Sequence, residues 1–255
     1  MKLLVDMGNS RLKSAQYTNG QLQQFFSVAY AKQSPLECLT AHLNTYPDIR
    51  EVTLVSVLGD RFYQQLKCWC QANDIILNWA ASSKQACGIQ SRYYEPESLG
   101  SDRFVALVGA RKLFPNQCCI VVDCGTAVTV DALTAEGVFC GGVIIPGLRL
   151  WGDSLVSRAD QLNAHQIQHP AVFARDTAQA IGSGSLYGLV GAIEGLCQRM
   201  QQQLSQELGA ELEVTRILCG GDAALVAEHA QLSFELLPEL VLMGLVEFTE
   251  TSCAS

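Results

Sequence analysis

Two segments of the chain place a carboxylate, a glycine and a polar side chain at the end of an apolar run. Residues 6–13 read DMGNSRLK, and residues 123–131 read DCGTAVTVD. A glycine lets the backbone approach a phosphate, and turn amides can point at its oxygens. Lys13 adds a positive charge, while Asp6 is placed to hold a hydrated Mg²⁺ beside phosphate oxygens. The second segment offers the Asp123 carboxylate and the Thr126 hydroxyl, so the pair indicates polyphosphate binding, although each segment alone also fits an ordinary hairpin turn.

A third segment, residues 93–104 (YYEPESLGSDRF), lies between these two and runs into an apolar periodic stretch. Transfer of a phosphoryl group to an alcohol requires a carboxylate within hydrogen-bond reach of the hydroxyl. Asp102 could be that base, with Arg103 beside it to fix a carboxylate or hydroxyl of the acceptor. The other interpretation is an ordinary helix start with Ser101 or Asp102 as the N-cap.

Residues 6–13 and residues 123–131, the two phosphate-type segments, each lie in a predicted meander of three strands. The first covers residues 3–7, 12–17 and 22–28, with turns at 8–9 and 19–20; the second covers 119–123, 128–133 and 138–145, with a turn at 136–137. Asp6 and Asp123 hold equivalent positions, which indicates an internal duplication. The alternative is a coincidence, because Asp-x-Gly after a strand is common.

Further elements follow each meander. We expect strands at residues 52–57 and 216–219, and helices at 102–114, 178–208 and 238–248, where apolar residues recur at three- and four-residue spacing. The boundary falls near Pro115. The sequence therefore predicts two α/β domains, residues 1–115 and 116–255.

Composition excludes several classes of protein. The 255 residues are 49% hydrophobic, with a formal charge of −8 and a pI near 5.0, so a nucleic-acid partner is not expected. The eleven cysteines include no Cys-x-x-Cys pair, which favours reduced, mostly core-packing thiols. The start shows no signal-peptide pattern, and residues 181–197 carry Glu194 and five glycines, so we expect no membrane span and a cytoplasmic location.

Three remaining features are ambiguous. Gly184, Gly188, Gly191 and Gly195 form a small-residue stripe that suits close helix approach, within the monomer or across a two-fold axis. Gly220 and Gly221, after a predicted strand, resemble the glycine pair that contacts adenosine in one superfold of nucleotide-binding proteins, and they fit an ordinary turn equally well. His165 and His169 are four apart but lack a third ligand, so we interpret them as a surface pair.

Four segments, taken in order, resemble the type III pantothenate kinase family. They are D-x-G-N-[ST]-x-x-K at 6–13, Y-x-x-P-x-x-L-G-x-D-R at 93–103, D-x-G-T-A-x-T-x-D at 123–131 and G-G-x-I-x-P-G at 141–147; residues 176–184 match less distinctively. The resemblance implies the superfold of actin, hexokinase and Hsp70: duplicated actin-like (ribonuclease H-like) α/β domains, each a mixed sheet with flanking helices, and a cleft between them. It implies ATP-dependent phosphorylation of pantothenate to 4′-phosphopantothenate, the first step of coenzyme A biosynthesis.

The same resemblance implies roles for individual residues. Asp102 would be the general base. The pantothenate pocket would be lined by Tyr93, Gly100, Ser101, Asp102, Arg103 and Thr177. The ATP contacts would be Asp6, Met7, Gly8, Asn9, Ser10, Arg11, Leu12, Lys13 and Thr126. Asp123 would bind a monovalent cation, K⁺ or NH₄⁺, and the active form would be a homodimer.

Two rival functions remain open from the sequence. One is a non-catalytic nucleotide-binding transcriptional accessory protein on the same superfold, which the presence of Asp102 and Arg103 disfavours. The other is a kinase or phosphatase of the superfold that acts on another small molecule such as a sugar. The segment 93–103 disfavours it, and so does a compact second half without large insertions.

Overall fold

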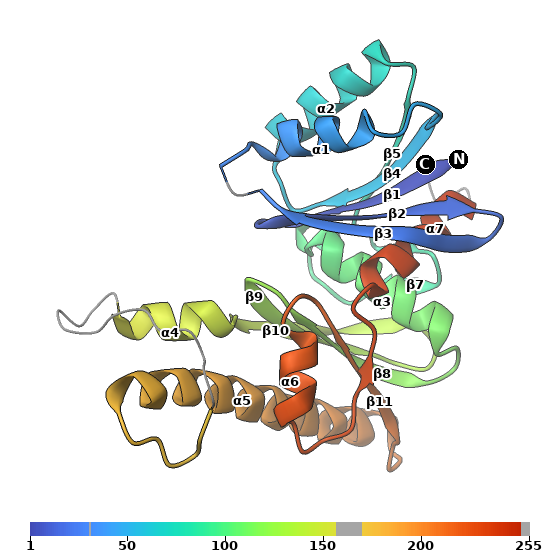
Figure 1. The fold of residues 1–255 in the computed structure, drawn as a ribbon. Helices are drawn as coiled ribbons and strands as arrows, with labels where there is room; N and C mark the ends of the chain where they lie inside the picture. Colours follow the sequence, from blue (N-terminus) through green and yellow to red (C-terminus); the bar gives the residue numbers. More distant parts are fainter. Residues whose placement is uncertain (31, 157–169, 251–255) are drawn as a thin grey trace. The chain divides into compact units, whose positions relative to one another are not determined.

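A computed structural model describes residues 1–250 apart from residue 31 and residues 157–169. The contacts divide the chain into two compact units. The first contains Met1–Pro115 and the segment from Glu239 onward, and the second contains Asn116–Pro238. Each unit is a mixed sheet with helices packed against it (Figure 1).

The sheet of the first unit has the strand order β3-β2-β1-β4-β5. Its strands are β1 (Lys2–Met7), β2 (Arg11–Thr18), β3 (Gln21–Ala29), β4 (Glu51–Ser56) and β5 (Ile76–Ala80). β1 pairs antiparallel with β2 and β2 with β3, whereas β1, β4 and β5 run parallel. The predicted meander is present, and its second turn places Asn19 and Gly20 at positive φ, as a tight hairpin requires.

Helices cover both faces of this first sheet. They are α1 (Pro35–Leu43), α2 (Asp60–Ala72), α3 (Ser101–Leu113) and α7 (Leu240–Glu250). Figure 1 shows α1 and α2 on one face and α3 and α7 on the other. Leu3, Val5 and Met7 of β1 join the core under α1 and α2, while Leu4 is buried and Asp6 half-buried on the opposite face. Two short strands, β6 (Gln85–Ala86) and β7 (Ile89–Ser91), form a hairpin.

The second unit repeats this topology. Its strands run in the order β12-β11-β8-β9-β10. They are β8 (Cys118–Cys124), β9 (Ala127–Leu133), β10 (Val138–Pro146), β11 (Val214–Cys219) and β12 (Glu235–Leu236). β8 pairs antiparallel with β9 and β9 with β10, and β8, β11 and β12 are parallel, as β1, β4 and β5 are. A shared order and a shared set of strand directions support the internal duplication rather than a coincidence.

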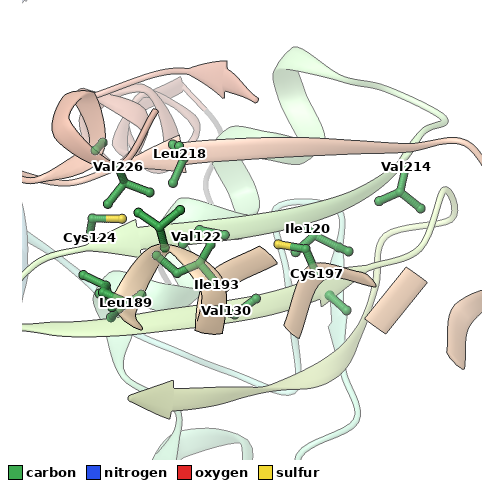
Figure 2. Close-up of a cluster of buried hydrophobic side chains, with 14 of the residues drawn as sticks. Ile120, Val122, Cys124, Val130, Leu189, Ile193, Cys197, Val214, Leu218 and Val226 are labelled. Carbon is green, nitrogen blue, oxygen red and sulfur yellow. The ribbon is translucent and has the colours of Figure 1, made fainter. Parts of the chain in front are cut away.

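The core of the second unit lies between its sheet and three helices. The helices of this unit are α4 (Leu148–Val156), α5 (Thr177–Leu208) and α6 (Ala223–His229). Figure 2 shows Val122 and Cys124 of β8 packed with Leu189 and Ile193 of α5 and Val226 of α6. Among the described residues, α5 alone is long and apolar enough to cross a membrane by length and composition, and 44% of its most apolar window is buried.

The glycine stripe of α5 serves packing at one position. A Cβ on Gly188 would lie 3.2 Å from the Trp151 ring of α4, so this glycine admits the close contact between the two helices. A Cβ on Gly184 or Gly191 would have no atom within 4 Å, and one on Gly195 would meet only the Arg199 side chain. Close approach inside the unit therefore accounts for Gly188 and leaves the other three positions unexplained.

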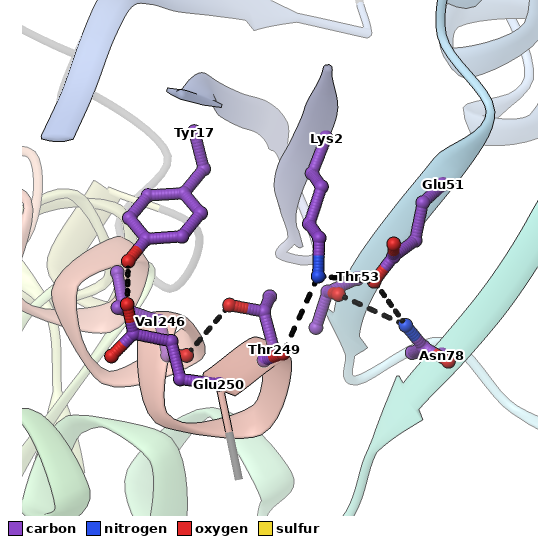
Figure 3. Close-up of polar contacts among 8 residues, drawn as sticks. All are labelled: Lys2, Tyr17, Glu51, Thr53, Asn78, Val246, Thr249 and Glu250. Atoms are coloured by element: carbon purple, nitrogen blue, oxygen red, sulfur yellow. Dashed lines mark hydrogen bonds and ion pairs between the residues drawn. The ribbon is translucent and has the colours of Figure 1, made fainter. Parts of the chain in front are cut away.

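The C-terminal helix α7 belongs with the first unit, whereas the sequence analysis assigned its residues to the second domain. A Cβ on Gly244 would lie 2.0 Å from the Val105 carbonyl oxygen, and one on Gly109 would lie 2.6 Å from the Leu240 carbonyl oxygen. The two helices α3 and α7 thus cross in backbone contact. Figure 3 shows the end of α7 tied to the sheet: Lys2 donates to the Thr249 carbonyl at 3.4 Å, and Tyr17 donates to Glu250.

Candidate active site

The first phosphate-type segment forms the turn between β1 and β2. Asp6 and Lys13 are direct cross-strand partners, so their side chains share one face of the sheet. The Gly8 amide donates to the Arg11 carbonyl at 3.1 Å and closes the turn, and Asn9 and Ser10 at its tip are exposed. Lys13 forms an ion pair with Glu239, just before α7, with 4.0 Å between nitrogen and oxygen.

The second segment forms the corresponding turn between β8 and β9. The Gly125 amide donates to the Ala127 carbonyl at 3.1 Å, which makes this turn one residue shorter than the first. The Gly147 amide donates a hydrogen bond to the Thr126 carbonyl at 3.1 Å, and the Thr126 side chain is exposed. A Cβ on Gly147 would meet the Gly125 and Thr126 carbonyl oxygens at 2.3 and 2.4 Å, so only glycine fits under this turn.

Asp123, at the end of β8, packs against the glycine pair that follows β11. Gly220 has φ +91°, and a Cβ there would lie 2.3 Å from the Asp123 Oδ1 atom. The next residues also brace the turn, because the Asp222 amide donates to the Cys124 carbonyl at 3.0 Å. This packing explains why glycine stands at position 220; Gly221 has open space around it.

The acceptor segment forms a 3₁₀ turn, η1 (Pro96–Ser98), and the start of α3. The helix is capped by Gly100, without a side-chain hydrogen bond, so the alternative interpretation of this segment, with Ser101 or Asp102 as the N-cap, was wrong. Both residues instead lie in the first helical turn, where the Asp102 Oδ1 atom accepts the Arg103 amide at 2.8 Å. Burial raises the pKa of Asp102 above its ordinary value, more than the Arg103 amide and guanidinium lower it.

Arg103 is buried and its guanidinium is held by Tyr93. The Nη1 atom donates to the Tyr93 hydroxyl at 3.1 Å, and the guanidinium carbon lies 5.8 Å from the centre of the same ring. A buried arginine held in this way has the plane of its guanidinium fixed. The structure therefore brings Tyr93, Gly100, Asp102 and Arg103 into one cluster.

Thr177 is the first residue of α5, in the second unit. Asp176 caps this helix by accepting the Gln179 amide at 2.8 Å, and the Thr177 side chain is exposed. The hydrogen bonds of Asp102 with Arg103 and of Arg103 with Tyr93 lie within the first unit.

The described residues contain no group of three or more His, Cys, Asp or Glu side chains that could hold a metal ion. A cation bound by Asp6 or by Asp123 would therefore take most of its ligands from backbone oxygens, substrate phosphates or water. His165 and His169 lie outside the described residues. The ten described cysteines are free thiols, and Cys68 is exposed rather than packed in the core as expected.

Sequence reasoning missed two residues beside the first turn, Tyr30 and Glu239. Tyr30 follows β3 and contacts the turn from the core side, and Glu239 meets Lys13. Each is distant from the turn in sequence and belongs to none of the recognised segments. Only the pairing of β3 with β2 and the packing of α7 bring them there.

Comparison with known proteins shows one consistent family. The model of the type III pantothenate kinase family matches residues 2–199. The type III pantothenate kinase of Herminiimonas arsenicoxydans is 37% identical over 256 residues, covering 96% of each chain. That of Aromatoleum aromaticum is 33% identical over 255 residues, covering all of both.

Solved structures give the fold. A conserved putative Baf family transcriptional activator from Campylobacter jejuni superposes with a TM-score of 0.60 at 18% identity and covers 97% of both chains. MreB5 of Spiroplasma citri bound to ADP gives 0.53 at 11% identity and covers 99% of this chain and 97% of its own. Identities this low concern the fold alone, and they confirm the predicted actin-like α/β fold.

A family model over most of the chain, together with full-length relatives above 30% identity, establishes that the chain belongs to the type III pantothenate kinase family, whose reaction is the phosphorylation of pantothenate in coenzyme A biosynthesis.

Proposed function

We propose that this chain transfers the γ-phosphoryl group of ATP to the 4′-hydroxyl of pantothenate, with Asp102 as the general base. The observation that carries the proposal is the half-buried Asp102 carboxylate in the first turn of α3, next to an arginine fixed by Tyr93. Burial raises the pKa of Asp102, which makes it a better proton acceptor than an exposed aspartate.

The proposed step moves one proton and exchanges one bond. Asp102 accepts the proton of the 4′-hydroxyl as the hydroxyl oxygen bonds to the γ-phosphorus. The bond between that phosphorus and the bridging β–γ oxygen breaks, and ADP leaves. Arg103 would hold a carboxylate or hydroxyl of pantothenate, and Tyr93, Gly100, Ser101 and Thr177 would line the rest of the pocket.

The nucleotide phosphates would be bound by residues 6–13 and by Thr126. The amides of the first turn and the Lys13 ammonium supply positive charge. Glu239 already offsets part of the Lys13 charge, since the two form an ion pair at 4.0 Å. The triphosphate therefore needs further cations.

We assign these cations to two carboxylates. Asp6 would hold Mg²⁺ through water, and the metal would neutralise the β- and γ-oxygens. Asp123 would hold a monovalent cation, K⁺ or NH₄⁺. A Cβ on Gly220 would lie 2.3 Å from the Asp123 Oδ1 atom and 2.6 Å from the Cys124 nitrogen, so this carboxylate oxygen lies close to the backbone of residue 220.

The active form would be a cytoplasmic homodimer in which residues near Thr177 complete the neighbour's pantothenate pocket. Thr177 is exposed, and nothing lies within 4 Å of a Cβ at Gly184 or Gly191 farther along α5, so this face has room for a partner. Mixing Asp102→Asn with Thr177→Ala subunits should restore activity beyond the sum of the two, because each mixed dimer has one intact site. Purely additive activity would contradict the shared pocket.

The acceptor itself is tested by product analysis. The protein is incubated with ATP, Mg²⁺, K⁺ and either pantothenate or a panel of sugars, and the products are identified by mass spectrometry. We expect a phosphorylated product from pantothenate alone, with the phosphate on the 4′-oxygen. Phosphorylation of a sugar at a comparable rate would show that the Tyr93–Arg103 cluster binds another acceptor.

A further inference from the structure

Tyr30, which follows β3, holds the turn between β1 and β2 from the core side. Its hydroxyl lies 2.8 Å from the Gly8 carbonyl oxygen and 3.0 Å from that of Arg11. Its backbone amide donates to the Ser10 carbonyl at 3.2 Å. The side chain is 7% exposed and packs in the same cluster as Met7 and Leu12. One residue, about twenty positions away in sequence, thus contacts three carbonyls of a four-residue turn.

These contacts fix the direction of a turn amide. In a trans peptide the carbonyl of one residue and the N–H of the next point in opposite directions, and the described chain has no cis peptide bond. The Gly8 carbonyl faces Tyr30, on the core side with Met7 and Leu12. The Asn9 N–H is therefore directed to the opposite face, where Asp6 and Lys13 lie as cross-strand partners.

We propose that Tyr30 is a positioning residue for the nucleotide: it holds the first turn so that the Asn9 amide faces the same side as Asp6 and Lys13, ready to donate to a phosphate oxygen of ATP. This inference rests on the proposed function of the turn and adds a residue outside the recognised segments. The hydroxyl stays protonated in the working range, because burial and then the Asp6 carboxylate raise the pKa of Tyr30.

The test is Tyr30→Phe, which keeps the ring and removes only the hydroxyl. Loss of one hydrogen bond should raise the KM for ATP about twofold to tenfold, with the KM for pantothenate nearly unchanged. Tyr46→Phe is the matched control, since Tyr46 packs against the same cluster but its ring meets His42 rather than the turn. It should leave both KM values at the wild-type level. Thermal unfolding, with and without ATP, reports whether each variant is folded.

A third variant, Lys13→Met, separates this inference from the proposed function. If Lys13→Met and Tyr30→Phe both raise the KM for ATP selectively, the inference is supported. If only Lys13→Met raises the KM for ATP, the turn binds ATP but Tyr30 does not position it. The inference about Tyr30 is then wrong, and the proposed function is unaffected. If neither changes the KM for ATP, the turn is not the phosphate site and both proposals fall. Equal rises in both KM values for Tyr30→Phe, with a lower Tm, would leave Tyr30 a purely structural role and also overturn the inference.

Discussion

The carboxylate of Asp102 has its position because position 100 has no side chain. Gly100 has an ordinary negative φ of −52°, so its backbone would accept alanine. A Cβ there would nevertheless lie 2.7 Å from the Asp102 Oδ1 atom and 3.6 Å from the Arg103 Cδ atom. The glycine that precedes the proposed base therefore leaves space for its carboxylate.

Replacing Asp102 by asparagine should abolish most turnover and keep the fold. A positioned base is worth about two to four orders of magnitude in rate, so we expect kcat to fall by roughly that factor. Asp60→Asn is the matched control, because Asp60 also stands in the first turn of a helix but is exposed. A near wild-type kcat in Asp102→Asn would place the base elsewhere.

Gly100→Ala should lower kcat while changing stability little. The added methyl displaces a flexible carboxylate rather than backbone, so the fold accommodates it, but displacement of a reacting group by about 1 Å can cost about a hundredfold in rate. Gly59→Ala provides the control: Gly59 is also a helix N-cap at negative φ, and its Cβ would meet nothing within 4 Å. Unchanged kcat in Gly100→Ala would show that the observed carboxylate position is not the reacting one.

Among the elements, the pair α3 and α7 connects the acceptor cluster to the sheet. α3 carries Asp102 and Arg103 in its first turn, and it crosses α7 where Gly109 and Gly244 meet. α7 in turn packs on β1, β4 and β5. The position of the proposed base thus depends on a helix crossing with no room for side chains.

Gly244→Ala should destabilise the protein markedly. Its Cβ would overlap the Val105 carbonyl oxygen at 2.0 Å, and backbone atoms cannot rotate aside as a side chain can. Overpacking of this kind costs about 1–3 kcal/mol or more, which thermal denaturation would show as a Tm lower by several degrees. Gly152→Ala is the control, since Gly152 lies inside α4 and its Cβ would be in ordinary contact, 3.7 Å from the Ser185 hydroxyl oxygen, so alanine there should gain up to about 1 kcal/mol. Equal Tm values for Gly244→Ala and the wild type would contradict the close crossing.

The sequence predicted elements that its local patterns define. Alternating apolar residues and Asn-Gly or Glu-Gly turns specified both meanders, and each predicted strand lies within one or two residues of the observed one. The start of α3 lies one residue before the predicted one, because the chain already turns at Gly100 and not at Ser101 or Asp102. The roles of Tyr30 and Glu239, and the place of α7, depend on contacts between distant segments that periodicity does not encode.

For the molecule as a whole, two units with the same strand order each end their first strand at an Asp-x-Gly turn. The two turns differ in length by one residue and in the residue paired with the aspartate, Lys13 in the first and Thr129 in the second. The first turn therefore has a cation on its aspartate's face, and the second has a hydroxyl. The two carboxylates therefore have different neighbours, and we propose that they hold different ions.

Activity should need a monovalent cation as well as Mg²⁺. The chain carries a formal charge of −8. At an effective dielectric constant near 20, two negative unit charges about 4 Å apart repel each other by about 4 kcal/mol. Uncompensated carboxylates near a triphosphate would therefore oppose its binding. In Tris buffer with Mg²⁺ alone, the enzyme should show almost no kinase activity. Adding K⁺ or NH₄⁺ should restore the activity more than adding Na⁺ does. Full activity without such an ion, or an unchanged K⁺ response in Asp123→Ala, would contradict the assignment.

The central claim, that this chain is a working kinase rather than a nucleotide-binding regulator of the same fold, is tested most directly by ADP release from ATP with and without pantothenate. The measurement uses the wild-type chain with Mg²⁺ and K⁺ in both arms. We predict ADP release that depends strictly on pantothenate and saturates with it. Binding of ATP without turnover in either arm would contradict the account.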